Sequence, residues 1–365
     1  RKEYAMLDRV HYRTCPLCEA TCGLQITTRE RAVVSIRGDD QDPFSRGFIC
    51  PKGSALKDLD ADPDRLRVPL LRRGDRFEPV SWDDAIAEIE RRLPPILRAN
   101  GGNSAALYFG NPSAHNPTLT LYLPVLARAL GTTNIYSAST VDQMPKQVSG
   151  GMMFGTSLSV PVPDIDRTDY WMILGANPIV SNGSLMTAPD VPERLAAIRR
   201  RGGKVVVVDP RRTRTADAAS EHVFIRPGTD AYFLFALVHV LFADDLVRPG
   251  RLSAHLNGLD AVRTLAAEFA PERVAERCGI DATTIRRLAH ELAAANTAAV
   301  YGRIGTCTQE YGVLASWLVD VVNVLTGNLD RPGGAMFTTP LLGAANTFGA
   351  PGRGKGVRFG RRHSR

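Results

Sequence analysis

The sequence predicts an α/β protein in which a small cysteine-rich N-terminal segment is followed by α/β domains built on parallel sheets. Two observations lead to this fold class. From about residue 165 onward, short apolar runs alternate with helical patterns, an order typical of a parallel sheet covered by helices. The run KVVVVDP at 204–210 is apolar on consecutive residues, as in strands that are buried on both faces.

The individual elements can be assigned in chain order. Residues 24–40 predict a hairpin-like pair of strands, and Ser81, followed by Asp83 and Asp84, predicts a capped helix over 82–100. The remaining strands are expected within 104–113, 134–139, 169–178, 204–213, 222–230 and 298–306, and the remaining helices within 119–132, 191–202 and 231–245 and after 306. These elements predict domains at 1–58, 59–140, 141–335 with a helical insert near 260–296, and a return segment at 336–365.

Composition excludes several classes of protein. The chain of 365 residues is long enough for more than one packed unit. Its net charge is +7, but the last 15 residues hold six Lys and Arg and no acid, so the rest is nearly neutral. We therefore expect no nucleic-acid groove. No stretch approaches the roughly 18 apolar residues of a membrane span. With no visible leader, we expect a cytoplasmic protein; an exported protein with a trimmed leader is the alternative.

Four cysteines stand at the front of the chain. Cys15, Cys18, Cys22 and Cys50 form the pattern C-x2-C-x3-C-x27-C. Disulfides, a structural zinc and a cubane iron–sulfur cluster are three alternatives. Three close cysteines pair poorly among themselves, and zinc sites usually use two C-x2-C turns, whereas only one pair here has that spacing. A cubane takes three neighbouring thiolates and a distant fourth, so the pattern favours an iron–sulfur cluster, with room for backbone at Gly53.

The cysteine motif and further stretches resemble the molybdopterin-dependent oxidoreductases, which include formate dehydrogenases, nitrate reductases and dimethyl sulfoxide reductase. The resemblance runs through most of the chain, in RGFICPKG, SWDDAI, YFGNPS, LGANPIVSN, VVVDPRRTRTADAASEHVFIRPGTDAY and LTGNLDRPGG. It implies the N-terminal half of a catalytic subunit, with domains I–III of that fold. It also implies a 4Fe-4S cluster and a bis-molybdopterin guanine dinucleotide that holds molybdenum or tungsten.

The resemblance assigns the cofactor to loops at successive strand ends of a Rossmann-like domain. Amide, hydroxyl, carboxylate and guanidinium groups there suit guanine, ribose and phosphate, although an Asp-Pro pair at a strand end is more often a simple turn. The expected cofactor-binding residues are Asn111, Gly175, Asn177, Ser181, Asp209, Arg211, Thr213, Gly228 and Asp230.

Two residues are assigned to catalysis by the same resemblance. Lys52 matches a lysine between cluster and pterin that assists electron passage, and a fixed cation there stabilises a reduced cluster; a solvated lysine is the alternative. Asp142 matches the position of the metal's protein ligand, as in membrane-bound nitrate reductases, and a carboxylate suits a high-valent metal. Alternatively, Asp142 caps a helix that begins at Gln143. Ser139 and Thr140 are weaker ligand candidates.

The expected activity is a two-electron oxidoreduction at molybdenum or tungsten, with oxygen-atom transfer favoured and the cluster passing electrons to a redox partner. Formate oxidation is disfavoured because Gln143, not histidine, follows Asp142, and because PLLGAANTFG carries no arginine. Cys307 is expected to be buried without contacting the metal. The alternatives are a molybdenum-free electron-transfer subunit, like the large subunit of complex I, and a zinc-binding module.

Overall fold

The computed structural model describes residues 8–30, 32–157 and 159–338. The chain divides into two compact units, 1–138 and 139–365. The basic tail, PLLGAANTFG and most of the predicted return segment lie outside the described residues. The domain boundaries expected from the sequence stay predictions.

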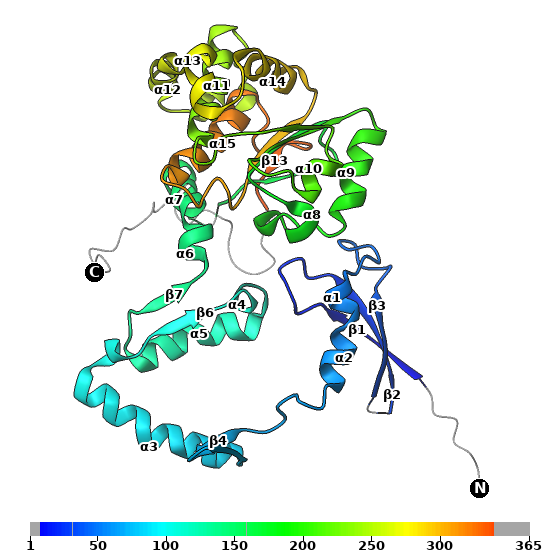
Figure 1. Cartoon of the computed structure of the whole chain (residues 1–365), viewed down its shortest axis with the longest axis vertical. Helices are drawn as coiled ribbons and strands as arrows, with labels where there is room; N and C mark the ends of the chain where they lie inside the picture. Colours follow the sequence, from blue (N-terminus) through cyan, green and yellow to red (C-terminus); the bar gives the residue numbers. More distant parts are fainter. Residues whose placement is uncertain (1–7, 31, 158, 339–365) are drawn as a thin grey trace. The chain divides into compact units, whose positions relative to one another are not determined.

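The first unit opens with an antiparallel three-stranded sheet in the order β1-β2-β3 (Figure 1). Strands β2 and β3 pair antiparallel, with Ile26 opposite Ile36, and this pair confirms the predicted hairpin. Ser81 accepts a hydrogen bond from the Asp84 N–H and so caps α3 as predicted. The elements are β1 Asp8–Thr14, β2 Gly23–Arg29, β3 Ala32–Gly38, α1 Pro51–Ser54, α2 Leu56–Ala61, β4 Leu70–Arg73, β5 Arg76–Pro79, α3 Trp82–Asn100, η1 Gly102–Ser104, β6 Leu107–Phe109, α4 Pro112–His115, α5 Pro117–Leu130 and β7 Ile135–Ser137.

The second unit holds a parallel sheet in the order β11-β10-β9-β12. Its helices and strands are α6 Ser139–Asp142, α7 Met144–Phe154, β8 Val162–Pro163, β9 Tyr170–Leu174, α8 Pro178–Ser181, η2 Ser184–Met186, α9 Val191–Arg200, β10 Lys204–Val208, α10 Arg214–Ala218, β11 Glu221–Val223, α11 Asp230–Ala243, η3 Gly250–His255, α12 Leu259–Ala266, η4 Ala267–Phe269, α13 Pro271–Cys278, α14 Ala282–Ala294, β12 Ala298–Gly302, α15 Gly312–Leu325 and β13 Ala335–Met336.

Both faces of this sheet are buried, which explains its unbroken apolar strands. Successive residues of β10 face opposite cores: Val206 and Val208 pack with α11, α14 and α15, whereas Val205 and Val207 pack with α9. The insert α12–α14 lies on the α11 side. The α/β fold class with parallel sheets is confirmed.

The strand order places a switch point between β9 and β12. The chain runs from β9 outward to β10 and β11, and then returns to add β12 on the other side of β9. Loops that leave neighbouring strands in opposite directions open a crevice at the carboxyl edge of such a sheet, where ligands bind. No helix among the described residues is long and apolar enough to cross a membrane.

Candidate functional site

The cysteine corner, which we define as Cys15, Cys18, Cys22 and Cys50 with their loops, is built by one strand connection and one helix start. Cys15 directly follows β1 and Cys22 directly precedes β2, and the Cys15 N–H donates to the Cys22 carbonyl at 2.8 Å. Cys18 lies at the tip of that connection, and Cys50 precedes α1. Strand pairing therefore brings together three thiols that are close in sequence, and the fold adds the fourth.

Burial and mutual repulsion disfavour thiolates in this corner. Burial is the largest cause that raises the pKa of Cys15 and that of Cys22, the latter to about 11, and the neighbouring cysteines raise both further. The charge of Lys52, an exposed residue of α1, lowers the pKa of Cys15. The Cys15 and Cys22 thiols therefore resist ionisation in the free protein, and iron ligation would remove the thiol protons of the corner.

The thiols of the corner, as the structure describes them, are not arranged as a single-ion site. Within the described ranges, no three His, Cys, Asp or Glu side chains come together closely enough to hold a single metal ion. A cubane differs because each thiolate binds a separate iron, so the thiols surround a volume instead of meeting at a point. A Cβ atom on Gly53 would lie 2.8 Å from Ile49 Cγ1 and 3.9 Å from Cys15 Sγ. Glycine therefore lets α1 approach the corner.

Asn111 also lies in the first unit. It directly precedes α4, and its side-chain amide donates to Glu19 Oε2 at 2.9 Å. Glu19 belongs to the connection that carries Cys18. Asn111 is thus held beside the cysteine connection, and its predicted role in cofactor binding stays a prediction.

At the switch point of the second unit, two loops touch through glycines. Gly175 follows β9 with φ +55°, and the Gly305 N–H, after β12, donates to the Gly175 carbonyl at 3.0 Å. A Cβ on Gly175 would lie 2.8 Å from the Gly305 Cα atom. Only glycine satisfies both the left-handed backbone and this close approach.

We give the name switch-point crevice to the loops after β9, β10, β11 and β12 at the carboxyl edge of the sheet. Asn177 and Ser181 follow β9 there, as the N-cap and the last residue of α8. Asn177 Oδ1 accepts a hydrogen bond from the Thr215 hydroxyl at 2.7 Å, and that hydroxyl accepts from the Ile179 N–H at 3.2 Å. Ser181 is exposed and its hydroxyl donates to the Asn177 carbonyl at 3.2 Å. The amide is fixed by Thr215, a residue that no motif in the sequence singled out.

Asp209 directly follows β10, and Asp230 is the first residue of α11 after the loop that leaves β11. They are close enough for Asp209 to raise the pKa of Asp230. Both are buried, and burial is the largest cause that raises the pKa of each. Asp209 accepts from the Arg211 N–H at 2.8 Å, and Asp230 accepts from Gln309 Nε2 at 2.8 Å. Neither bond brings a full positive charge, so both carboxylates keep acceptor capacity for N–H groups of a ligand.

Three further predicted residues complete this edge. Thr213 accepts from the Ala216 N–H and caps α10. The Arg211 side chain is exposed, and Gly228 has φ +79° with open space where a Cβ would lie. Arg211 and Gly228 are thus accessible to a ligand, whereas Thr213 is buried.

Several buried polar atoms at the carboxyl edge have no hydrogen-bond partner among the residues that the structure describes. They are Thr306 Oγ1 and Gln309 Oε1 after β12 and His222 Nδ1 on β11. An unsatisfied buried polar group is costly, and a polar ligand would satisfy it. Together with the remaining acceptor capacity of the Asp209 and Asp230 carboxylates, these atoms fit a nucleotide-like group that carries both donors and acceptors.

Asp142 is the last residue of α6, and the alternative that it caps the next helix is wrong. The N-cap residue of α7 is Gln143, which makes no side-chain cap bond, and α7 begins at Met144. The Asp142 side chain is 33% exposed, and Oδ1 lies 3.8 Å from the Arg303 guanidinium. Its role as metal ligand stays a prediction. Cys307 is buried as expected, with Sγ 3.7 Å from Ser316 Oγ.

Sequence reasoning missed Arg303 and Lys146. Both are buried cations whose partners lie more than 160 residues away: Arg303 contacts Asp142, and Lys146 contacts Asp320. A signal was present for the second pair, because Asp320 is the one charged residue in the mostly apolar sequence of α15. A buried carboxylate in such a helix requires a partner.

Comparisons with known proteins identify the family. The family model "Molybdopterin oxidoreductase" matches residues 65–355, and the model "Molybdopterin oxidoreductase Fe4S4 domain" matches residues 8–59. The chain is similar to acetylene hydratase from Pelobacter acetylenicus in structure, with TM-score 0.74 and 22% identity over 87% of this chain and 43% of that one. That likeness supports the fold alone.

Curated relatives agree with the family models. The chain is 27% identical to formate dehydrogenase H of Escherichia coli, covering 92% of this chain and 47% of the relative. It is 29% identical to periplasmic nitrate reductase of Desulfovibrio desulfuricans, with 92% and 45% covered. It is 28% identical to the thiosulfate reductase subunit PhsA of Salmonella typhimurium, with 88% and 41% covered.

The chain therefore spans about half the length of these relatives. The two family models bring a 4Fe-4S cluster to residues 8–59 and a molybdopterin cofactor with molybdenum or tungsten to the α/β part. The cysteine corner and the polar crevice fit these groups. On the match to most of its length, the chain belongs to the molybdopterin oxidoreductase family.

Proposed function

We propose that this chain is the N-terminal part of a molybdenum- or tungsten-dependent oxidoreductase that performs a two-electron reaction on a small molecule. The observation that carries the proposal is that one chain holds both a four-thiol corner and, in its second unit, a switch-point crevice with unsatisfied polar groups. When bound, the metal–pterin group would supply two-electron redox chemistry, and the cluster would transfer single electrons.

The chain's own residues bind and orient these groups in the proposal. Cys15, Cys18, Cys22 and Cys50 are the cluster ligands, and the Lys52 ammonium supplies a positive charge that favours the reduced cluster. In the crevice, the carboxylates accept from guanine or ribose donors, while amide, hydroxyl and guanidinium groups bind phosphate and sugar oxygens. The crevice residues are Gly175, Asn177, Ser181, Asp209, Arg211, Thr213, Gly228 and Asp230.

Asp142 is the proposed protein ligand of the metal. A carboxylate is a hard donor, and its side chain here is accessible and unencumbered by a close hydrogen bond from Arg303. A hard ligand favours oxygen-atom transfer, and Gln143 after it differs from the histidine of formate dehydrogenases. We therefore favour oxygen-atom transfer over formate oxidation. The proposal also includes a partner protein that accepts or donates electrons, and the cytoplasm as the compartment.

Elemental analysis of the full-length protein, purified without air, tests the proposal. We expect about four iron atoms and one molybdenum or tungsten per chain. Iron without either metal, from cells supplied with both, would favour the molybdenum-free electron-transfer subunit. Zinc without iron would overturn the proposal, and the Fe4S4 family match already speaks against that outcome.

A further inference from the structure

Two buried cations, Arg303 and Lys146, connect the short segment that carries Asp142 to other parts of the second unit. The first is Arg303, which follows β12 and whose side chain is 3% exposed. Its guanidinium donates to the Asp142 main-chain carbonyl, and its Nε donates to Ser184 Oγ at 3.1 Å. Its distance to Asp142 Oδ1 is 3.8 Å, longer than a hydrogen bond. Arg303 thus binds the backbone of Asp142 and leaves the carboxylate available.

The second cation is Lys146, one helical turn further along the chain. Its ammonium lies 2.8 Å from both carboxylate oxygens of Asp320 on α15 and 3.5 Å from the Ser316 carbonyl. Both side chains of the ion pair are at most 3% exposed. The start of α7 is therefore fixed to α15, on the side of the sheet where α11 packs.

Stability alone is a weak explanation for these charges. Desolvation of a buried ion pair offsets much of its Coulomb energy, and apolar side chains of similar volume often serve as well or better. What a charged pair adds is a defined direction and distance, because the ion finds few alternative partners in an apolar core. Here both pairs act on one five-residue stretch, 142–146, which enters from α6 and turns into α7.

We propose that Arg303 and Lys146 are positioning residues that hold segment 142–146 at both ends and aim the Asp142 carboxylate. Orientation of the Asp142 carboxylate matters for function only if Asp142 is the metal ligand, as proposed above. The immobilisation of segment 142–146 does not depend on that proposal, and it can be measured separately.

Amide hydrogen exchange in the full-length enzyme tests the immobilisation. The Gln143 N–H donates to the Ser139 carbonyl at the end of α6, and the Lys146 and Gln147 N–H groups donate to the Gln143 carbonyl at the start of α7. In Arg303→Met we expect the exchange of the peptide covering 142–147 to become about 10-fold faster or more, because a hydrogen bond from a charged donor is lost. Arg303→Lys, which keeps the charge and one donor, should restore part of the protection.

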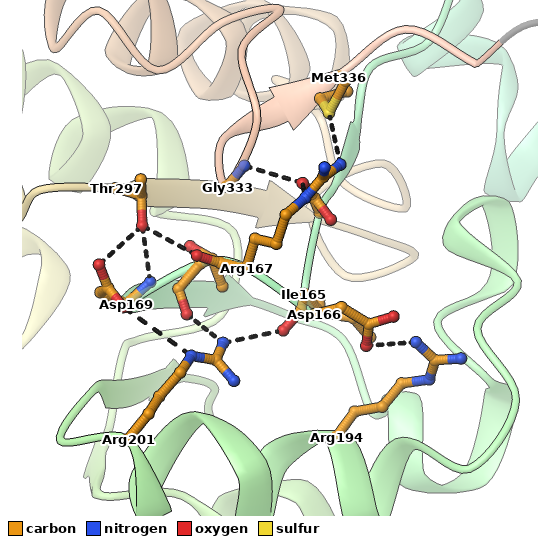
Figure 2. A network of polar contacts seen from close by, with 11 residues as sticks. Ile165, Asp166, Arg167, Asp169, Arg194, Arg201, Thr297, Gly333 and Met336 are labelled. Atoms are coloured by element: carbon orange, nitrogen blue, oxygen red, sulfur yellow. Dashed lines mark hydrogen bonds and ion pairs between the residues drawn. The ribbon is translucent and has the colours of Figure 1, made fainter.

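Arg201 provides a matched control at the opposite edge of the same sheet. It also donates to main-chain carbonyls, those of Ile165 and Thr168, and its Nε lies 3.8 Å from Asp169 Oδ1 (Figure 2). Arg201→Met should leave exchange at 142–147 unchanged. Unchanged exchange in Arg303→Met, or an equal increase in Arg201→Met, would overturn the proposal.

The role of Lys146 in holding segment 142–146 can be tested without leaving a buried charge unpaired. Lys146→Met combined with Asp320→Leu removes both charges at similar volume, so the protein should fold. We expect faster exchange at 142–147 and an unchanged rate within 314–325 of α15. Full protection of 142–147 in this double variant would remove Lys146 from the proposal.

A spectroscopic measurement tests separately whether Arg303 orients the Asp142 carboxylate and whether Asp142 binds the metal. In the metal-loaded enzyme, Arg303→Met should change the electron paramagnetic resonance spectrum of the one-electron-reduced metal, as should Asp142→Asn. If Asp142→Asn leaves the spectrum unchanged, the ligand assignment fails while the exchange result still judges the immobilisation. If Asp142→Asn changes it and Arg303→Met does not, the aiming role is wrong.

Discussion

The cysteine corner and the switch-point crevice assemble their polar groups in opposite ways. In the corner, three of four thiols stand within eight residues and one strand connection gathers them. In the crevice, the groups come from loops after β9, β10, β11 and β12, spread over more than 130 residues. A site like the corner can be recognised from the spacing of its residues in the sequence. A site like the crevice forms only when the strands take their order in the sheet.

The contrast predicts different responses to substitution. Removal of one corner residue eliminates a ligand that nothing else replaces, so the loss should be complete. Removal of one crevice residue weakens a site whose other groups remain, so the loss should be graded. The predictions below test this difference.

The largest effect is expected for Cys22→Ser. The Cys22 thiol is buried among the other three, and a serine hydroxyl is a poor iron ligand in that position. We expect loss of the 4Fe-4S absorbance and of about four iron atoms per chain. Cys278→Ser is the control, because Cys278 is equally buried but lies on α13. Normal iron content in Cys22→Ser would show that the corner is not the cluster site.

A smaller but still large effect is expected for Asp142→Ala. If Asp142 binds the metal, activity of the intact enzyme should fall by at least the roughly 10- to 100-fold that loss of an outer-shell partner costs. The neighbouring Val141→Ala variant is the control, since the Val141 side chain is 67% exposed and has no atom that could bind the metal. Full activity of Asp142→Ala would eliminate the ligand assignment.

A graded effect is expected for Asp230→Asn. Burial raises the pKa of Asp230 above its ordinary 3.8, so folding disfavours the charged form. The folded state therefore loses stability as pH rises from 3.8 to the raised pKa, and the whole cost is present at neutral pH. Asparagine removes this cost while still accepting from Gln309.

The cofactor-free variant should thus have a higher unfolding temperature at pH 7 and an unchanged one below about pH 3. Its retention of the pterin cofactor should fall about 10-fold, since one charged acceptor is lost. Asp245→Asn serves as control because that carboxylate is 97% exposed. A destabilised Asp230→Asn protein at pH 7 would contradict the sign of this argument.

The sequence predicted what depends on short stretches. Consecutive valines at 205–208 identified a central strand, and cysteine spacing identified the cluster segment, because both patterns are set by neighbours in the chain. The cap role for Asp142 failed because a cap depends on where the backbone turns, and α7 begins at Met144, one residue later than the cap prediction required. Arg303 was missed because its partner lies 161 residues away. Such contacts follow from topology, which local patterns do not encode.

The smallest effect is expected at the corner itself, for Lys52→Gln. Lys52 is exposed, so water screens its charge, yet it still acts on the Cys15 sulfur. Loss of the charge should lower the cluster's reduction potential by a few tens of millivolts, because the reduced cluster is the more negative form. Lys52→Arg should preserve the potential, and the difference between Gln and Lys should shrink as salt is raised. A difference in reduction potential that does not depend on salt would mean that Lys52 acts through a direct contact and not through its screened charge. The corner would then contain, like the crevice, a side chain whose loss has a graded effect.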